Sequence, residues 1–207
     1  MKRIMIYGDS ITWGRIPGTT CRYDKNIRYT GVVSNQLGKE YEVIEEGLRA
    51  RMFSGENPNF QDRDGLKQFG PIFGSHVPLD LVIIMLGTND TNTVSRKSAN
   101  EIYADFHKYL EAVHQWSTEL ENPAPELLFV SPPLVIEANT HGDPKFVGAE
   151  KKTRDIPAVL ESITRKMNVH FMDGSIVSGG EIEGIHIDEA SHIILGEAMA
   201  EKIKEIL

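Results

Sequence analysis

The clearest strand in the sequence is Leu79–Leu86, which reads Leu-Asp-Leu-Val-Ile-Ile-Met-Leu, and Gly87-Thr88-Asn89-Asp90 follows it directly. From Leu81 onward every residue of this run is apolar. Strands that are covered on both faces show such continuous runs, whereas strands with one solvated face alternate apolar and polar residues. The run therefore predicts a buried strand of a parallel sheet, with a polar loop at its carboxyl end.

On both sides of this strand, the chain alternates between strand-like and helix-like segments. Further strands are predicted at residues 3–7, 41–45, 127–130 and 169–172, and helices at 30–37, 98–120, 151–167 and from 188 or 191 to 206. We expect a kink or a late start at Pro157, and a long irregular loop over residues 48–78. The alternation predicts a single α/β domain over residues 1–207, with a parallel sheet of about five strands covered by helices on both faces.

Composition excludes several classes of protein. The net charge of −8 argues against broad nucleic-acid binding, which needs clustered Lys and Arg. The single cysteine, Cys21, excludes a disulfide within the chain. The first apolar run is shorter than the roughly 7–15 residues of a signal peptide, and no run approaches the roughly 18 of a membrane helix. We therefore expect a cytoplasmic protein that does not bind membranes.

Three loops that follow predicted strands carry residues suited to acyl transfer. Ser10 follows the first strand as a candidate nucleophile, and Asn89 follows the third with an amide that can donate to an oxyanion. Glu183 precedes His186 by three residues, so its carboxylate can fix the tautomer of a histidine base. Each piece alone is also typical of an ordinary turn or a solvated surface. Because carboxyl ends of parallel strands share one edge, their conjunction indicates an active site.

The same segments, in the same order, resemble the SGNH (GDSL-type) hydrolase family. The resemblance rests on Gly8-Asp9-Ser10, Gly87-Thr88-Asn89-Asp90 and Gly184-Ile185-His186. More narrowly, residues 8–14, 43–51, 78–91 and 130–133 resemble its arylesterase/acyltransferase subgroup. This resemblance implies a three-layer α/β/α fold and hydrolysis, or transfer, of small carboxylic esters through an acyl-serine. It implies Ser10 as nucleophile and His186 as base, with an oxyanion hole made of the N–H groups of Ser10 and Ala50 and the amide of Asn89.

Two positions depart from the family pattern. The family usually has glycine at Ala50, and a backbone donor tolerates alanine there if its φ is negative. The family has aspartate at Glu183, whose extra methylene a different rotamer or a backbone shift must absorb. Asp188, which we rank below Glu183, could orient His186 instead, and a third option is a backbone carbonyl with no acid needed.

The surroundings of the site leave several alternatives. Trp13 and Asp9 are expected to contact the substrate, while Arg49 and Arg51 either face the entrance or form ion pairs. The loop aromatics line a pocket or a homo-oligomer interface, as the subgroup tends to associate through this loop; they are Phe53, Phe60, Phe69 and Phe73.

Several other substrates and functions are compatible with the same residues. The ester of a carbohydrate, a lysophospholipid or a thioester is an alternative small-molecule substrate within the family. A catalytically weakened relative, or a flavodoxin-like module that cradles phosphate, is an alternative to an active esterase. No metal or cofactor is expected, since the histidines lack ligand spacing such as His-Glu-x-x-His.

Overall fold

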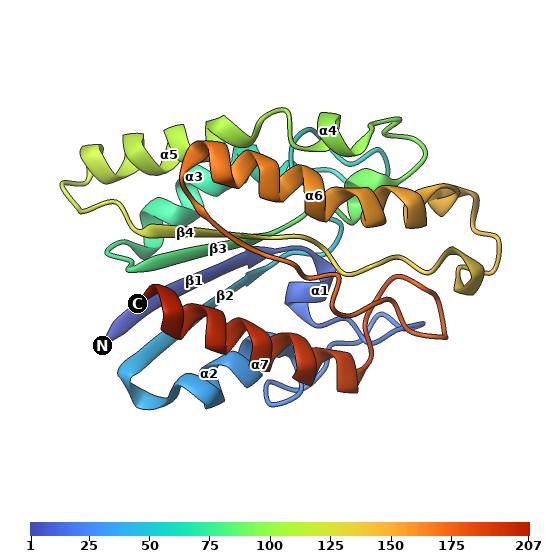
Figure 1. The fold of residues 1–207 in the computed structure, drawn as a ribbon, viewed down its shortest axis with the longest axis horizontal. Coiled ribbons are helices and arrows are strands. Elements are labelled where there is room, and N and C mark those ends of the chain that lie inside the picture. Colours follow the sequence, from blue (N-terminus) through green and yellow to red (C-terminus); the bar gives the residue numbers. More distant parts are fainter.

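Five parallel strands form the centre of the computed structural model, which describes all residues from 1 to 207 (Figure 1). Their order across the sheet is β2-β1-β3-β4-β5. The strands are β1 (Lys2–Gly8), β2 (Tyr41–Gly47), β3 (Leu81–Met85), β4 (Glu126–Val130) and β5 (His170–Met172). The predicted α/β class, the parallel pairing and the number of strands are confirmed.

Helices cover both faces of the sheet and complete three layers (Figure 1). One layer holds α3 (Gly65–His76), α4 (Ala99–Ile102), α5 (Phe106–Glu119) and α6 (Ala149–Met167). The other holds α2 (Tyr29–Leu37) and α7 (Glu189–Ile206), and the short α1 (Ser10–Trp13) lies at the carboxyl ends of the strands. No helix combines the length and the apolar character needed to cross a membrane.

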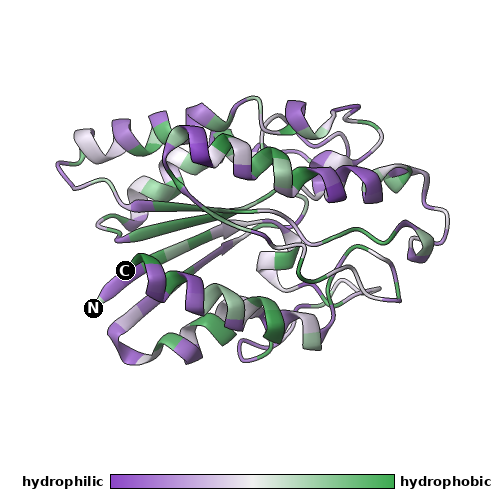
Figure 2. Cartoon of the chain, viewed as in Figure 1, coloured by the Kyte–Doolittle hydropathy of each residue, from purple (hydrophilic) through white to green (hydrophobic).

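Alternate residues of β3 enter two separate cores, which explains its uninterrupted apolar run. Leu81, Ile83 and Met85 pack beneath α2 and α7. Val82 and Ile84 pack with the aromatic residues of α3 and α5 on the opposite face. In Figure 2 the hydrophobic colouring is concentrated on the strands and on the inward sides of the helices.

The expected irregular loop over 48–78 is wrong in its second half, where α3 forms. Asp64 begins this helix by accepting a hydrogen bond from the N–H of Lys67. Its glycines are needed because Trp116 of α5 packs against them: a Cβ at Gly70 or Gly74 would approach the indole to 2.4 Å. Packing against α5 therefore outweighs the poor helix propensity of glycine and of Pro71.

Two other helices differ from their predicted form. The predicted helix 98–120 is divided after α4, although its capping box between Ser98 and Glu101 is present. The division falls at Tyr103, whose hydroxyl donates to the carbonyl of Leu86 beyond β3. The late start expected at Pro157 as the alternative to a kink is absent, since α6 begins at Ala149 and runs through Pro157 to Met167.

The strand order brings the three loops of the predicted site together. β1 lies between β2 and β3, and Gly8 at its end is paired with both Gly47 and Met85. The loops that follow these strands hold Ser10, Ala50 and Asn89. Active sites of open α/β sheets form at such places, where the chain leaves a strand toward different sides of the sheet.

Candidate active site

Ser10 is the first residue of α1, directly after the turn that ends β1. Asp9 caps this helix, its Oδ1 accepting a hydrogen bond of 2.9 Å from the N–H of Ile11. Glycine is required at position 8, because a Cβ there would lie 2.0 Å from Oγ1 of Thr12. The helix ends after one turn at Gly14, which has a φ of 84°. This tight turn holds the Ser10 backbone with its N–H free of any acceptor in the protein.

His186 meets Ser10 in the arrangement that acyl transfer requires. Ser10 Oγ lies 2.8 Å from His186 Nε2, and both residues are buried, with exposed fractions of 6 % and 5 %. On the other side of the ring, Nδ1 is hydrogen-bonded to Oε1 of Glu183. An N–H at Nδ1 leaves Nε2 unprotonated, so Nε2 can accept the serine proton.

Glu183 accepts hydrogen bonds from three nitrogen atoms, which hold its longer side chain in place. Oε1 also accepts the N–H of His186 at 3.1 Å, and Oε2 reaches across to the N–H of Gly18 at 3.0 Å. Burial alone would raise the pKa of Glu183, but the hydrogen bond and charge of His186, together with these N–H groups, lower that pKa to about 2. The carboxylate is therefore ionised throughout the neutral range.

Neither alternative partner of His186 is found at Nδ1. Asp188 caps α7 instead, its Oδ1 accepting a hydrogen bond of 2.8 Å from the N–H of Ser191. No backbone carbonyl contacts Nδ1, whose partner is Glu183.

Three donors suited to an oxyanion lie beside Ser10. The N–H groups of Ser10 and Ala50 donate to nothing within the protein. One Nδ2 proton of Asn89 goes to the carbonyl of Arg51 at 3.0 Å, and the other faces Oδ2 of Asp9 at 3.4 Å. That second contact is long, so the proton is available to a substrate oxygen.

Ala50 departs from the condition that the sequence suggested, since its φ is +66° and not negative. A residue with a Cβ in the left-handed region costs about 1 kcal/mol relative to glycine. The segment is fixed from both sides: the N–H of Leu48 donates to the carbonyl of Gly8, and the carbonyl of Ala50 accepts from Nδ2 of Asn57. The backbone strain therefore lies at Ala50, which lines the cleft and whose N–H has no acceptor in the protein.

Two buried carboxylates lie beneath the site. Asp9 is not among the residues that line the cleft, and its carboxylate contacts Asn89 and the turn of Ser10. Asp90 accepts the N–H of Phe53 at 2.8 Å and so connects the loop after β3 to the loop after β2. Burial raises the pKa of Asp9 to about 6 and that of Asp90 to about 7, against the lowering effect of their hydrogen bonds.

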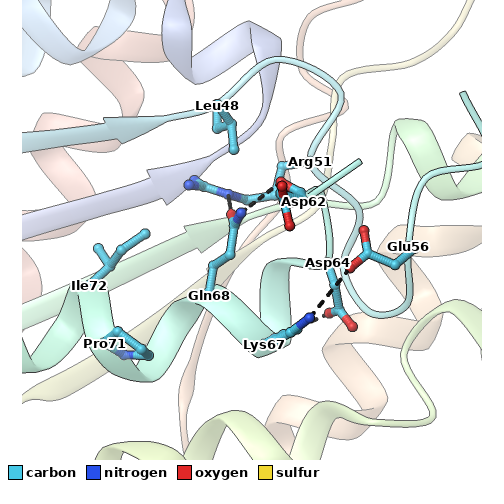
Figure 3. A pocket seen from close by; sticks show the side chains of 9 residues that line it. All are labelled: Leu48, Arg51, Glu56, Asp62, Asp64, Lys67, Gln68, Pro71 and Ile72. Atoms are coloured by element: carbon cyan, nitrogen blue, oxygen red, sulfur yellow. Dashed lines mark hydrogen bonds and ion pairs between the residues drawn. The ribbon is translucent and has the colours of Figure 1, made fainter. Parts of the chain in front are cut away.

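Arg51 has a positioning role that sequence reasoning did not find. Its guanidinium is buried against the ring of Tyr7 and donates to the carbonyls of Gly8 and Glu46, where β1 and β2 end. Figure 3 shows Gln68 of α3 pointing toward it, and Nε of Arg51 donates to Oε1 of Gln68. These contacts join segments that no local sequence pattern connects, so only the three-dimensional arrangement identifies them.

Arg49 and Trp13 lie near the entrance. The guanidinium carbon of Arg49 stands 5.4 Å from the centre of the Trp13 ring, and Arg49 lines the cleft while Trp13 does not. Arg49 thus lines the cleft, and Trp13 supports it through a cation–π contact from outside the lining.

The loop aromatics are mostly core residues, contrary to both alternatives raised for them. Phe53, Phe69 and Phe73 are completely buried. They make edge-on or tilted contacts with Tyr7, Tyr103 and Tyr109, and Phe69 stacks on Phe73. Only Phe60 is exposed, at 54 %, and it lines the cleft.

The cleft has a volume of about 480 Å³ and is lined mostly by polar and charged residues. Four of its 17 lining residues are hydrophobic, namely Ala50, Phe60, Phe146 and Ile185. Ser10, Asn89, Glu183 and His186 all contribute to it. The predicted nucleophile, base, acid and oxyanion donors are therefore brought together in one cleft.

Comparison with known proteins identifies similar chains. The sequence profile of the GDSL-like Lipase/Acylhydrolase family matches residues 6–191. The native aryl esterase of M. smegmatis is 37 % identical with a TM-score of 0.94, and Est24, a carbohydrate acetylesterase from Sinorhizobium meliloti, is 34 % identical with a TM-score of 0.93. Each comparison covers 100 % of both chains. No curated protein sequence matches the chain.

Proposed function

The chain belongs to the GDSL-like lipase/acylhydrolase family and is an enzyme that hydrolyses esters, and we propose that it does so through an acyl intermediate on Ser10. The observation that carries this proposal is the distance of 2.8 Å between Ser10 Oγ and His186 Nε2 in a buried site. Glu183 at the opposite ring nitrogen supports it, since a serine is a weak nucleophile until a correctly oriented base accepts its proton.

The first half of the reaction forms the acyl-enzyme. Ser10 Oγ attacks the carbonyl carbon of the ester while its proton passes to His186 Nε2. The carbonyl oxygen becomes an oxyanion, which accepts hydrogen bonds from the N–H groups of Ser10 and Ala50 and from Asn89. The intermediate then collapses and breaks the bond to the alcohol, which leaves with the proton from Nε2.

The second half releases the acyl group. Water attacks the acyl carbon of Ser10 and gives a proton to Nε2, and the second intermediate collapses to the free acid as that proton returns to Oγ. Glu183 stays ionised and stabilises the imidazolium in both halves. A second alcohol that replaces water would give acyl transfer, which we propose as a side reaction because the cleft is open to solvent.

The nature of the cleft favours small acyl groups on polar alcohols. Most of its lining residues are amides, charged groups or hydroxyls, including Asn57, Asn59, Asn92 and Thr140. Long acyl chains need an apolar tunnel, and only four hydrophobic residues line this space. Acetylated sugars, the substrates that the name of Est24 indicates, are therefore a second candidate beside simple aryl esters.

The test is hydrolysis of p-nitrophenyl acetate by Ser10→Ala and His186→Ala. Both variants should lose about 10³-fold or more in kcat, because neither the nucleophile nor the base has a substitute in the cleft. Full activity of Ser10→Ala would contradict the proposal.

We also propose that copies of the chain associate through the loop between β2 and α3. Phe60 is the large apolar side chain that this loop exposes. Phe60→Ser should shift the mass measured by light scattering toward the monomer, whereas a monomeric native protein would exclude association.

A further inference from the structure

Four basic side chains line the cleft of a protein that is acidic as a whole. They are Arg15, Arg49, Arg63 and Lys145, and the chain carries a net charge of −8. None of the four lies within 4.0 Å of a carboxylate. Twelve of the other 18 arginines and lysines form ion pairs with a carboxylate, whereas none of the four in the cleft does.

The acidic residues of the cleft do not neutralise it. Only two line it, Glu183 and Asp143. Glu183 is bound to His186 and Gly18, and Asp143 accepts the N–H of Lys145 with its Oδ1. The cleft therefore carries more positive than negative charge.

Two of the four cations are free of hydrogen bonds in the protein. Arg63 is held by the carbonyls of Arg49, Gln61 and Asp62, and Arg15 donates from Nε to the carbonyl of Thr19. The guanidinium of Arg49 contacts the Trp13 ring but donates no hydrogen bond, and the ammonium of Lys145 has no partner. Both groups can therefore bind a ligand without first losing a bond.

The position of the cations indicates which part of a substrate they meet. Ser10 is buried, so the acyl group that it receives lies at the inner end of the cleft. Arg15 and Arg49 are half-buried and Lys145 is exposed, which places them toward the solvent side. The alcohol part of the ester extends in that direction, since it must leave while the acyl group remains.

We infer that the enzyme selects esters whose alcohol part carries a negative charge, as a carboxylate or a phosphate. This inference rests on the proposed function of Ser10. Arg49 and Lys145 bind the anion directly, and the like charges around them raise its local concentration. An excess of one sign of charge in a cleft raises the association rate of an oppositely charged ligand, by about tenfold at low ionic strength.

The probes for this test are 3-acetoxybenzoate and its neutral counterpart 3-acetoxybenzamide, which have the same acyl group and nearly the same shape. Each kcat/KM is divided by the rate constant for hydroxide hydrolysis of the same ester, which removes the difference in leaving group. The normalised ratio of anion to amide should be about tenfold at low ionic strength and should shrink several-fold in about 0.5 M salt.

Variants locate the effect. Arg49→Gln and Lys145→Gln should each lower the ratio by about two- to fivefold, mainly through KM of the anion. Lys39→Gln is the matched control, because Lys39 is exposed, forms no ion pair and lies in the turn before β2, away from the cleft. It removes the same charge and should leave the ratio unchanged.

The outcomes separate the inference from the proposed function. A native ratio near one, or a ratio that Arg49→Gln and Lys145→Gln together do not change, would overturn the anion preference while Ser10→Ala remained inactive. Activity retained by Ser10→Ala would instead overturn the proposed function.

Discussion

Replacing Glu183 by glutamine should reduce kcat by about 10²-fold or more. In the structure this carboxylate accepts hydrogen bonds from Nδ1 and the N–H of His186 and from the N–H of Gly18. Glutamine keeps the length of the side chain but loses the charge. Its amide can also turn to present N–H to the ring, which would favour the wrong tautomer of His186.

The magnitude follows from the hydrogen bond between Glu183 and Nδ1 of His186. The pKa of Glu183 falls from 4.5 to about 2 even though burial opposes the change, which gives the direction of the effect. A hydrogen bond to a charged group contributes about 1.5–3 kcal/mol. The same attraction acts on the imidazolium that forms as Ser10 is attacked, so its loss raises the barrier by a similar amount, or about 10²-fold in rate.

The assay measures kcat and KM for p-nitrophenyl acetate between acid and alkaline pH. Glu183→Asp should lie between the native enzyme and Glu183→Gln, because the shorter side chain cannot reach both His186 and Gly18. Asp188→Asn should leave kcat nearly unchanged, since Asp188 caps α7 and asparagine caps almost as well. Glu181→Gln controls for the loss of one exposed negative charge nearby, and circular dichroism checks that each variant is folded.

Native-like kcat in Glu183→Gln would refute this reasoning. A large loss in Asp188→Asn with little change in Glu183→Gln would assign the orienting role to Asp188 instead. A loss confined to KM would also count against it, because the imidazolium exists only during the chemical steps.

Three further predictions concern stability and positioning. Ala50→Gly should raise the free energy of unfolding by about 1 kcal/mol in urea, and a decrease would show that the left-handed backbone is not strained. Between about pH 4 and 7, folded Asp9 and Asp90 hold protons that the unfolded chain has lost, so their contribution to stability should decline as pH rises through this window. Asp90→Asn should flatten that decline in urea titrations, and an unchanged slope would assign it to other groups. Arg51→Lys should lower the free energy of unfolding by about 1.5–3 kcal/mol and also lower kcat, because lysine cannot hold the carbonyls of Gly8 and Glu46 in the same geometry; unchanged kcat would leave Arg51 a purely structural role.

The sheet and the main catalytic groups could be predicted because local rules determine them. The apolar run of β3 indicates a strand with two covered faces, and the loop that follows such a strand lies at the sheet edge. Ser10, Asn89 and His186 each occur soon after a strand or just before a helix, so their meeting follows from topology. The order of the strands then fixes which loops are neighbours.

Other features depend on contacts that no local pattern contains. α3 has a composition typical of a loop. It is helical because it packs against α5, where the indole of Trp116 lies directly on Gly70 and Gly74. The positive φ of Ala50 occurs in a segment held by two hydrogen bonds, from the N–H of Leu48 to the carbonyl of Gly8 and from Nδ2 of Asn57 to the carbonyl of Ala50.

The cluster of cations in the cleft also could not be predicted from a local sequence pattern. Arg15, Arg49, Arg63 and Lys145 come from loops that are distant in the sequence, so their grouping appears only in three dimensions. Each of them alone would read as an ordinary exposed charge in the sequence.

The most direct test of catalysis by Ser10 is covalent labelling by a fluorophosphonate, followed by mass measurement of the intact chain and of its peptides. We expect one label per chain, on Ser10, with loss of esterase activity in proportion to labelling and no labelling of Ser10→Ala. A label on another residue, or a native enzyme that keeps its activity once Ser10 is fully labelled, would contradict it.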